Sequence, residues 1–182
     1  MNDFVVSPVG VSFETQAQGE NIALLMRKHF ITNLAWIFLG VVLILLPPLL
    51  LSGALGFTLN QFIILSPQTI TALILTWYLF TFGYIFEHFM VWYFNLYILT
   101  NRRVVDIDFY HLLYKAISAA DLEDIEDVTF RMGGIMQALF NYGDIEIQTA
   151  GSVNQFEFHS VPQPAFVQKR ILELAKPGGK DD

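Results

Sequence analysis

The feature that most constrains this chain is a long stretch without charge. Residues 30–86 contain no Asp, Glu, Lys or Arg, although these residues make up 15% of the whole sequence. A helix crosses the roughly 30 Å hydrocarbon core of a bilayer with about 20 apolar residues, so the stretch can hold two crossings. Backbone polar groups must be satisfied inside the bilayer, which favours helices. The sequence therefore predicts a pair of transmembrane helices.

The crossings are expected at residues 31–51 and 67–93. Pro47 and Pro48 lie in the first, and each removes a backbone donor, which predicts a kink or an end of the regular helix there. Residues 53–61, with two glycines and several polar side chains, predict the connecting turn. Ser66 followed by proline is typical of a helix N-terminus, and it predicts the start of the second crossing.

Basic residues flank this hairpin on one side. Arg27 and Lys28 precede it, Arg102 and Arg103 follow it, and the connecting loop has none. By the positive-inside rule, both termini are cytoplasmic and the protein is a multi-pass component of the cell membrane. The first apolar run is too long, and its basic cluster comes too late, for a cleaved signal peptide. We therefore expect an uncleaved anchor.

The remainder of the chain is acidic and lacks cysteine. Residues 94–182 hold 8 Lys and Arg against 13 Asp and Glu. Nucleic acids and anionic lipid headgroups both favour basic surfaces, so neither is an expected main partner of this region. The absence of cysteine from the sequence excludes disulfides, thiolate metal sites, cysteine nucleophiles and palmitoylation.

Beyond residue 94 the hydrophobic period changes from helical to two, which predicts short strands with one polar face. The expected strands cover residues 94–100, 103–109, 127–132, 144–149 and 156–159, with turns at 101–102, 133–134, 141–144 and 151–152. Such a series favours a small antiparallel barrel or sandwich. A helix is expected at 164–176, where Val167, Ile171 and Leu174 share one face. That face should cover the open end of the barrel.

Several stretches resemble bacterial pleckstrin-homology-like (PH-like) domains that follow membrane helices. Residues 97–104 (YILTNRRV) resemble the opening strand and turn, and residues 122–128, 139–145 and 149–151 resemble the central strand, short helix and glycine turn. Phe158, Val161 and Pro164 fall where that family enters its final helix. The similarity covers roughly residues 94–175. Many relatives carry a basic residue near Gln137, and its absence from residues 135–139 weakens an inherited anion-binding role.

The expected fold is therefore α+β, a two-helix transmembrane hairpin followed by a small PH-like antiparallel β-barrel with a C-terminal helix. The expected parts are an N-terminal cytoplasmic segment (1–29), the hairpin (30–93), the PH-like domain (94–176) and a tail (177–182). Whether residues 1–26 form an extra strand, an interfacial helix or a tail is open at this point.

Five carboxylates gather in one short stretch of the expected PH-like domain. They are Asp121, Glu123, Asp124, Glu126 and Asp127. One interpretation is a docking surface for a basic protein partner, and another is a weak divalent-cation site. The spacing lacks the pattern of an EF-hand loop, which disfavours calcium. A third interpretation is a solvated strand edge whose charge blocks edge-to-edge pairing.

Two further pairs are candidate sites. Arg102 and Arg103 could hold a lipid headgroup phosphate, or could serve only to fix the cytoplasmic side of the hairpin. Glu87 and His88 lie near the inner end of the second crossing, where ionisable groups are candidates for proton or ion transfer. The alternative is that Glu87, about one to two turns from the helix end, lies within reach of the headgroups and pairs with a neighbour or with water.

The sequence favours a noncatalytic binding or scaffolding module at the cytoplasmic face. Its expected partners are the lipid bilayer and a protein, or a second copy of the chain in a homo-oligomer, rather than nucleic acid. The alternative function is a small transporter or channel subunit that uses Glu87 and His88. An enzyme is disfavoured because His111 and His159 belong to no nucleophile or metal-ligand pattern, and no cofactor or metal is expected.

Overall fold

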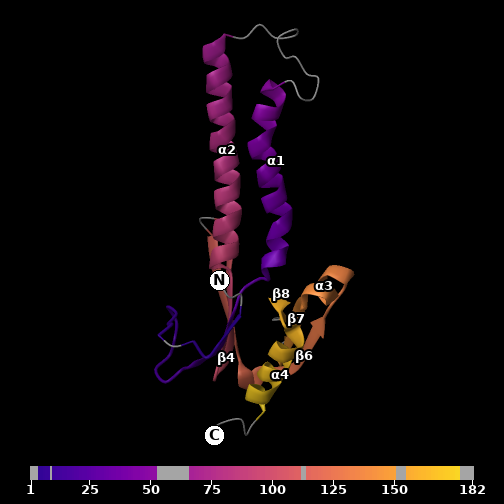
Figure 1. The fold of residues 1–182 in the computed structure, drawn as a ribbon. Helices are drawn as coiled ribbons and strands as arrows, with labels where there is room; N and C mark the ends of the chain where they lie inside the picture. The colour runs from indigo at the N-terminus through magenta and orange to yellow at the C-terminus, as the bar shows by residue number, and fades with distance from the viewer. Residues whose placement is uncertain (1–3, 9, 53–65, 112–113, 151–154, 177–182) are drawn as a thin grey trace. The chain divides into compact units, whose positions relative to one another are not determined.

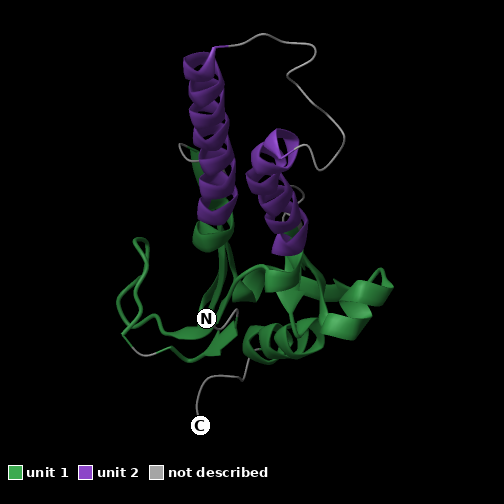
Figure 2. Cartoon of the chain, turned by 45° about the horizontal axis from the view of Figure 1, so that its top comes forward, with its two compact units in different colours: residues 1–32, 91–182 green, residues 33–90 purple. Residues whose placement is uncertain are grey.

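The computed structural model describes residues 4–8, 10–52, 66–111, 114–150 and 155–176. The predicted turns at 53–61 and 151–152 and the tail at 177–182 lie outside these residues. The chain forms two compact units (Figure 2). One is the strand unit, residues 1–32 and 91–182, and the other is the helical unit, residues 33–90.

The helical unit is built from two long apolar helices (Figure 1). A short 3-10 turn, η1 (Phe30–Asn33), leads into α1 (Leu34–Leu51), and α2 spans Pro67–Phe94. Among the described residues, the segments Phe30–Leu51 and Pro67–Phe94 are long and apolar enough to cross a membrane. Only 11% and 6% of their most apolar windows are buried, so these helices expose their side chains, unlike the core helix of a soluble protein.

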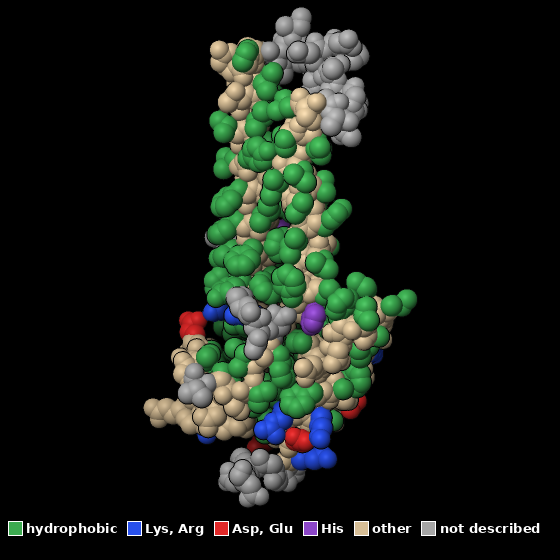
Figure 3. All heavy atoms as spheres, viewed as in Figure 1, with side chains coloured by type: hydrophobic (Ala, Val, Ile, Leu, Met, Phe, Trp, Pro, Cys, Tyr) green, Lys and Arg blue, Asp and Glu red, His purple; other side chains and the backbone are tan. Residues whose placement is uncertain are grey.

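Figure 3 shows hydrophobic side chains along both helices. The predicted start of α2 is confirmed, because the Ser66 hydroxyl accepts a hydrogen bond from the Thr69 N–H at 3.3 Å. Of the two outcomes predicted at the prolines, a kink or an end, the end does not occur, since α1 continues through Pro47 and Pro48 to Leu51. The reason lies on α2, where two aromatic side chains replace the missing donors. The Trp77 indole N–H donates to the Leu43 carbonyl at 2.9 Å, and the Tyr78 hydroxyl donates to the Ile44 carbonyl at 3.2 Å.

The strand unit holds two antiparallel sheets. The first has the order β1-β2-β3-β4-β5, formed by Phe4–Val6, Ile22–Met26, Leu96–Thr100, Arg103–His111 and Tyr114–Asp121. The second has the order β6-β7-β8, formed by Ile125–Arg131, Tyr142–Thr149 and Gln155–Pro162. The turn η3 (Leu122–Asp124) joins the sheets, α3 (Ile135–Phe140) joins β6 to β7, and α4 (Pro164–Ala175) ends the unit.

One hydrophobic core lies between the sheets and under α4. It contains residues from both sheets, such as Leu24, Leu99 and Ile145, together with Val167 and Ile171 of α4. The Gln168 side chain also donates to the Val128 carbonyl at 2.6 Å, which ties α4 to β6. The prediction that the final helix covers the strand-built body is therefore confirmed.

The main difference from the sequence-based organisation is at the N-terminus. The expected PH-like domain began at residue 94, but β2 (Ile22–Met26) pairs with β3 and supplies Leu24 and Met26 to the core. The sequence pattern does not indicate this pairing, because residues 27–95, including both long helices, lie between the two strands. The helical hairpin is thus an insertion between two neighbouring strands of the sheet. Met26, the last residue of β2 before the hairpin, pairs with Tyr97 of β3, just after it.

The strand unit has two distinct ends. At the exit end, β2 finishes at Met26 and β3 begins at Leu96. At the acidic end lie the β3–β4 turn and the segment 121–127, since Arg103 pairs with Asp121 in the sheet. The five residues of β3 separate these ends by roughly 17 Å at about 3.3 Å per residue.

Candidate functional site

The acidic end presents a surface of separate carboxylates. Asp121, Glu123, Asp124, Glu126 and Asp127 are all exposed, whereas Leu122 among them is buried in the core. They lie at the end of β5, on η3 and at the start of β6, and both strands are at sheet edges among the described residues. Within the described chain, no three His, Asp or Glu side chains are arranged to hold a metal ion. This arrangement suits a docking surface or a charged sheet edge.

Beside the acidic segment, the β3–β4 turn is held by a buried ion pair that the sequence did not reveal. The Arg103 guanidinium bonds both carboxylate oxygens of Glu20, at 2.9 and 3.0 Å. The Thr100 hydroxyl donates to the same carboxylate at 2.8 Å. The Glu20 side chain is fully buried, whereas the Arg103 side chain is 23% exposed. A bidentate contact of this kind is among the stronger charged hydrogen bonds in proteins.

The pKa values follow from these contacts. Burial raises the pKa of Glu20, but hydrogen bonds from Arg103, the Ala17 N–H and Thr100 outweigh burial, and the net pKa lies below the ordinary 4.5. The hydrogen bond to Glu20 in turn raises the pKa of Arg103, against the opposing effect of burial. Both groups therefore stay charged at neutral pH.

This network changes the interpretation of the two arginines. Arg103 is engaged within the fold, and Arg102 is exposed beside it. Both lie at the acidic end, about one strand length from the exit end. The lipid-headgroup role predicted for them remains a prediction. No local pattern could have paired Arg103 with Glu20, because the two are 83 residues apart.

Glu87 and His88 lie in the helical unit, on α2. The His88 Nδ1 atom is 2.9 Å from the Tyr84 carbonyl, one helical turn earlier. The His88 ring also lies against the rings of Tyr84 and Trp36, with centroids 4.2 and 5.9 Å apart. These contacts give His88 local partners within the helical unit, and both interpretations of Glu87 and His88 remain predictions.

A second buried polar group lies between the sheets, toward the exit end. Asp106 on β4 is 8% exposed, and its Oδ1 atom has no hydrogen-bond partner in the described chain. Burial, followed by the charge and hydrogen bond of Asp108, raises the pKa of Asp106 to about 7, and Lys28 partly opposes this. Tyr97, opposite Asp106 in the sheet, also has a raised pKa, because it is buried and faces the Asp106 carboxylate.

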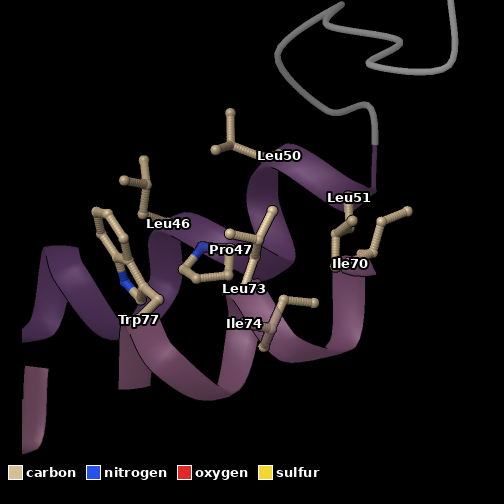
Figure 4. Close-up of a pocket in the computed structure, with 8 residues that line it drawn as sticks. All are labelled: Leu46, Pro47, Leu50, Leu51, Ile70, Leu73, Ile74 and Trp77. Atoms are coloured by element: carbon tan, nitrogen blue, oxygen red, sulfur yellow. The ribbon is translucent and has the colours of Figure 1, made fainter. Parts of the chain in front are cut away.

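The helical unit contains an apolar pocket between α1 and α2 (Figure 4). Its lining residues are Leu46, Pro47, Leu50, Leu51, Ile70, Leu73, Ile74 and Trp77. Figure 4 shows Pro47 and Trp77 among these side chains, so the pocket lies where the prolines interrupt the backbone hydrogen bonds of α1. Such a lining suits hydrocarbon and offers no group for acid–base chemistry.

Two sheets enclosing one core, closed by a C-terminal helix, define a PH-like domain. The sequence matches the bacterial PH domain family over residues 21–175, and the protein belongs to that family. This match confirms the resemblance found in the sequence, and it begins one residue before β2, in agreement with β2 as part of the domain.

Among solved structures, the chain is similar to a DUF1696 family protein with a pleckstrin-homology domain from Shewanella loihica PV-4. The two are 14% identical, the match covers 45% of this chain and 71% of that one, and the TM-score is 0.37. No curated protein matches the chain.

Proposed function

We propose that the protein is a membrane-anchored, noncatalytic binding module that presents its PH-like domain at the cytoplasmic face. The anchor is the pair α1 and α2, whose apolar side chains are largely exposed. The binding surface is the acidic end, and its partner is a basic segment of another protein or of a second copy. Anchoring raises the effective concentration of the domain near membrane partners.

The observation that carries this proposal is the separation of the two ends of the strand unit. The chain departs toward the helices at Met26 and returns at Leu96, whereas the five carboxylates lie at the opposite end of β3. The carboxylates thus lie about one strand length from the points where the chain enters and leaves the hairpin, and a basic protein segment complements their charge. A protein partner is therefore favoured over a lipid headgroup at this surface.

Anchoring and topology can be tested with single cysteines, because the sequence contains none. In intact bacterial cells, a membrane-impermeant maleimide should label Ser66→Cys, at the outer start of α2, and spare Ser118→Cys on β5. Permeabilised cells should label both. Labelling of Ser118→Cys in intact cells, or extraction of the protein by alkaline carbonate, would contradict the anchor and its orientation.

The binding role can be tested by photo-crosslinking in membranes with a photoreactive residue at Asp124. We expect a discrete protein adduct that is lost in Glu123→Gln/Glu126→Gln. The matched control is Glu157→Gln/Glu173→Gln, which removes the same charge from exposed sites on β8 and α4. Equal adduct in both double variants, or crosslinking to lipid alone, would reject the acidic end as the binding surface.

A further inference from the structure

The short helix α3 carries a surface that the proposed binding role does not use. The exposed fractions of Ile135, Met136, Leu139 and Phe140 are 85%, 51%, 71% and 40%, and no residue of α3 is buried. Figure 3 shows hydrophobic side chains gathered over this helix. The surrounding segment 132–143 contains no charged residue, although the region downstream of residue 94 is acidic. An exposed apolar patch on a polar domain marks an interaction surface.

The four apolar side chains form one face. Ile135 and Leu139 are four residues apart, as are Met136 and Phe140, and at about 100° per residue the set covers an arc of roughly 140°. Gln137 lies off this arc, and its side-chain oxygen accepts the Gly133 N–H, which closes the turn before the helix. The polar side chain of α3 is thus used within the fold, and the apolar face is left outward.

Within the strand unit, α3 lies at the exit end. Tyr142 follows α3 by two residues, and its ring stacks on the His29 ring with centroids 5.1 Å apart. The His29 N–H donates to the Ser160 carbonyl at 2.8 Å, which fixes this segment against β8. The next residue, Phe30, is 50% exposed and begins the first candidate membrane span. β6 runs from the acidic segment toward α3, and residues 128–131 span roughly 13 Å between Asp127 and the end of the strand.

The neighbouring side chains at the exit end are of the kind found at membrane interfaces. The Phe30 ring meets the Trp92 ring edge-on at 6.1 Å, and the Trp92 indole N–H donates to the Lys28 carbonyl at 3.0 Å. The Arg27 guanidinium lies over the Tyr93 ring at 4.6 Å from its centroid. Aromatic rings and basic residues gather at headgroup depth in membrane proteins.

From these contacts we infer that the apolar face of α3 inserts into the interfacial layer of the bilayer, as a third membrane contact beside the two anchoring helices. The inference rests on the proposed anchoring. An apolar helical face can lie in the plane of the interface, with its side chains among the upper acyl segments. Three contacts would restrict rotation of the strand unit about the ends of the helices and hold the acidic end away from the membrane.

The test is spin labelling of single-cysteine variants of the full chain in vesicles of phosphatidylethanolamine and phosphatidylglycerol. The labelled sites are Leu139→Cys and, as a second variant, Ile135→Cys, whose side chains are exposed and dispensable for the core. Ser118→Cys on β5 is the aqueous control, and Leu79→Cys, 70% exposed on α2, reports the anchor. We expect labels at positions 139 and 135 to lose access to an aqueous nickel chelate and to gain access to oxygen, relative to position 118.

The outcomes separate the two claims. A label at position 79 that is open to the chelate would reject the anchor itself. The α3 inference would be overturned, with the anchor intact, by a different pattern. In that pattern the label at position 79 is exposed to lipid, and the labels at positions 139 and 135 are as accessible to the chelate as the label at position 118. Labels at 139 and 135 shielded from both reagents, with spin–spin broadening between copies, would show that a second chain covers α3 and would also overturn it.

Discussion

The Trp77 indole N–H donates to the carbonyl of Leu43, 34 residues earlier, at 2.9 Å. In a regular helix the N–H of the residue four positions later would take that carbonyl, but this residue is Pro47 and has no N–H. In the same way, Pro48 has no N–H to donate to the carbonyl of Ile44, and the Tyr78 hydroxyl donates to that carbonyl instead. An unsatisfied backbone carbonyl is costly in apolar surroundings, and side chains of α2 supply the two donors that Pro47 and Pro48 remove from α1.

Replacing Trp77 by Phe should therefore weaken the hairpin. We expect Trp77→Phe to lower the free energy of unfolding by about 0.5–2 kcal/mol, the range for interhelical hydrogen bonds in membranes. Pro47→Ala restores the missing N–H, so the cost of Trp77→Phe should shrink in that background. Denaturant titration of the four proteins of this double-mutant cycle in detergent measures both costs. An equal cost in the two backgrounds would show that the hydrogen bond is not responsible.

Loss of the Glu20 charge should destabilise the strand unit strongly. Glu20→Gln leaves the partly buried Arg103 without its counter-charge, and breaking such a pair costs about 3 kcal/mol or more. The control is Glu14→Gln, which removes an exposed carboxylate paired with Lys115 at 3.0 Å and should cost less than about 1 kcal/mol. Thermal unfolding at neutral pH compares the two. Similar costs would contradict a special role for the buried pair.

The Glu20 contribution should depend on pH in a definite direction. Because its folded pKa lies below the ordinary 4.5, the stabilisation is present above pH 4.5 and is lost as the pH falls through the folded pKa. The stability difference between the wild type and Glu20→Gln should therefore narrow below pH 4.5. A constant difference between pH 3 and pH 7 would disagree with a charged Glu20 in the native state.

Asp106 should have the opposite pH dependence. Its folded pKa of about 7 lies above the ordinary 3.8, so between these values the unfolded chain loses a proton that the folded chain keeps, and stability falls as the pH rises. Asp106→Asn removes this penalty and should raise the melting temperature at pH 8. Near pH 4 the variant and the wild type should differ little. A variant less stable at both pH values would show that the carboxyl group has a structural role.

Gly143 should tolerate no side chain. A Cβ atom there would lie 2.5 Å from the Arg131 carbonyl oxygen and 2.9 Å from the Met132 side chain, where β7 folds back under the turn before α3. We expect Gly143→Ala to cost about 1–3 kcal/mol, as overpacking does. The control is Gly134→Ala, which meets no atom within 4 Å. Thermal unfolding of both variants checks this, and equal melting temperatures would contradict the close approach.

Local patterns predicted much of the architecture. The charge-free run, the period-two segments and the spacing of Val167 and Ile171 each depend on residues near one another in the chain, so the long helices, most strands and α4 were found. β2 was left open, as the extra strand among three possibilities for residues 1–26, because Ile22–Met26 is covered on both faces. Its residues pack in the main core and in a second cluster with Ile98 and Val105, so it lacks the alternation of a half-buried strand. β5, largely exposed and alanine-rich, also lacks that alternation.

The sequence by itself determined that this chain carries two long apolar helices, an acidic strand-built domain and no cysteine chemistry, because composition and short-range periodicity are properties of the chain alone. The tertiary structure decided which distant groups meet: Glu20 with Arg103, Trp77 with Leu43, and β2 with β3 across the inserted hairpin. Such pairings depend on the packing of the whole fold, and no local pattern encodes the partner of a single side chain. The same packing put the carboxylates and the apolar face of α3 at opposite ends of one domain.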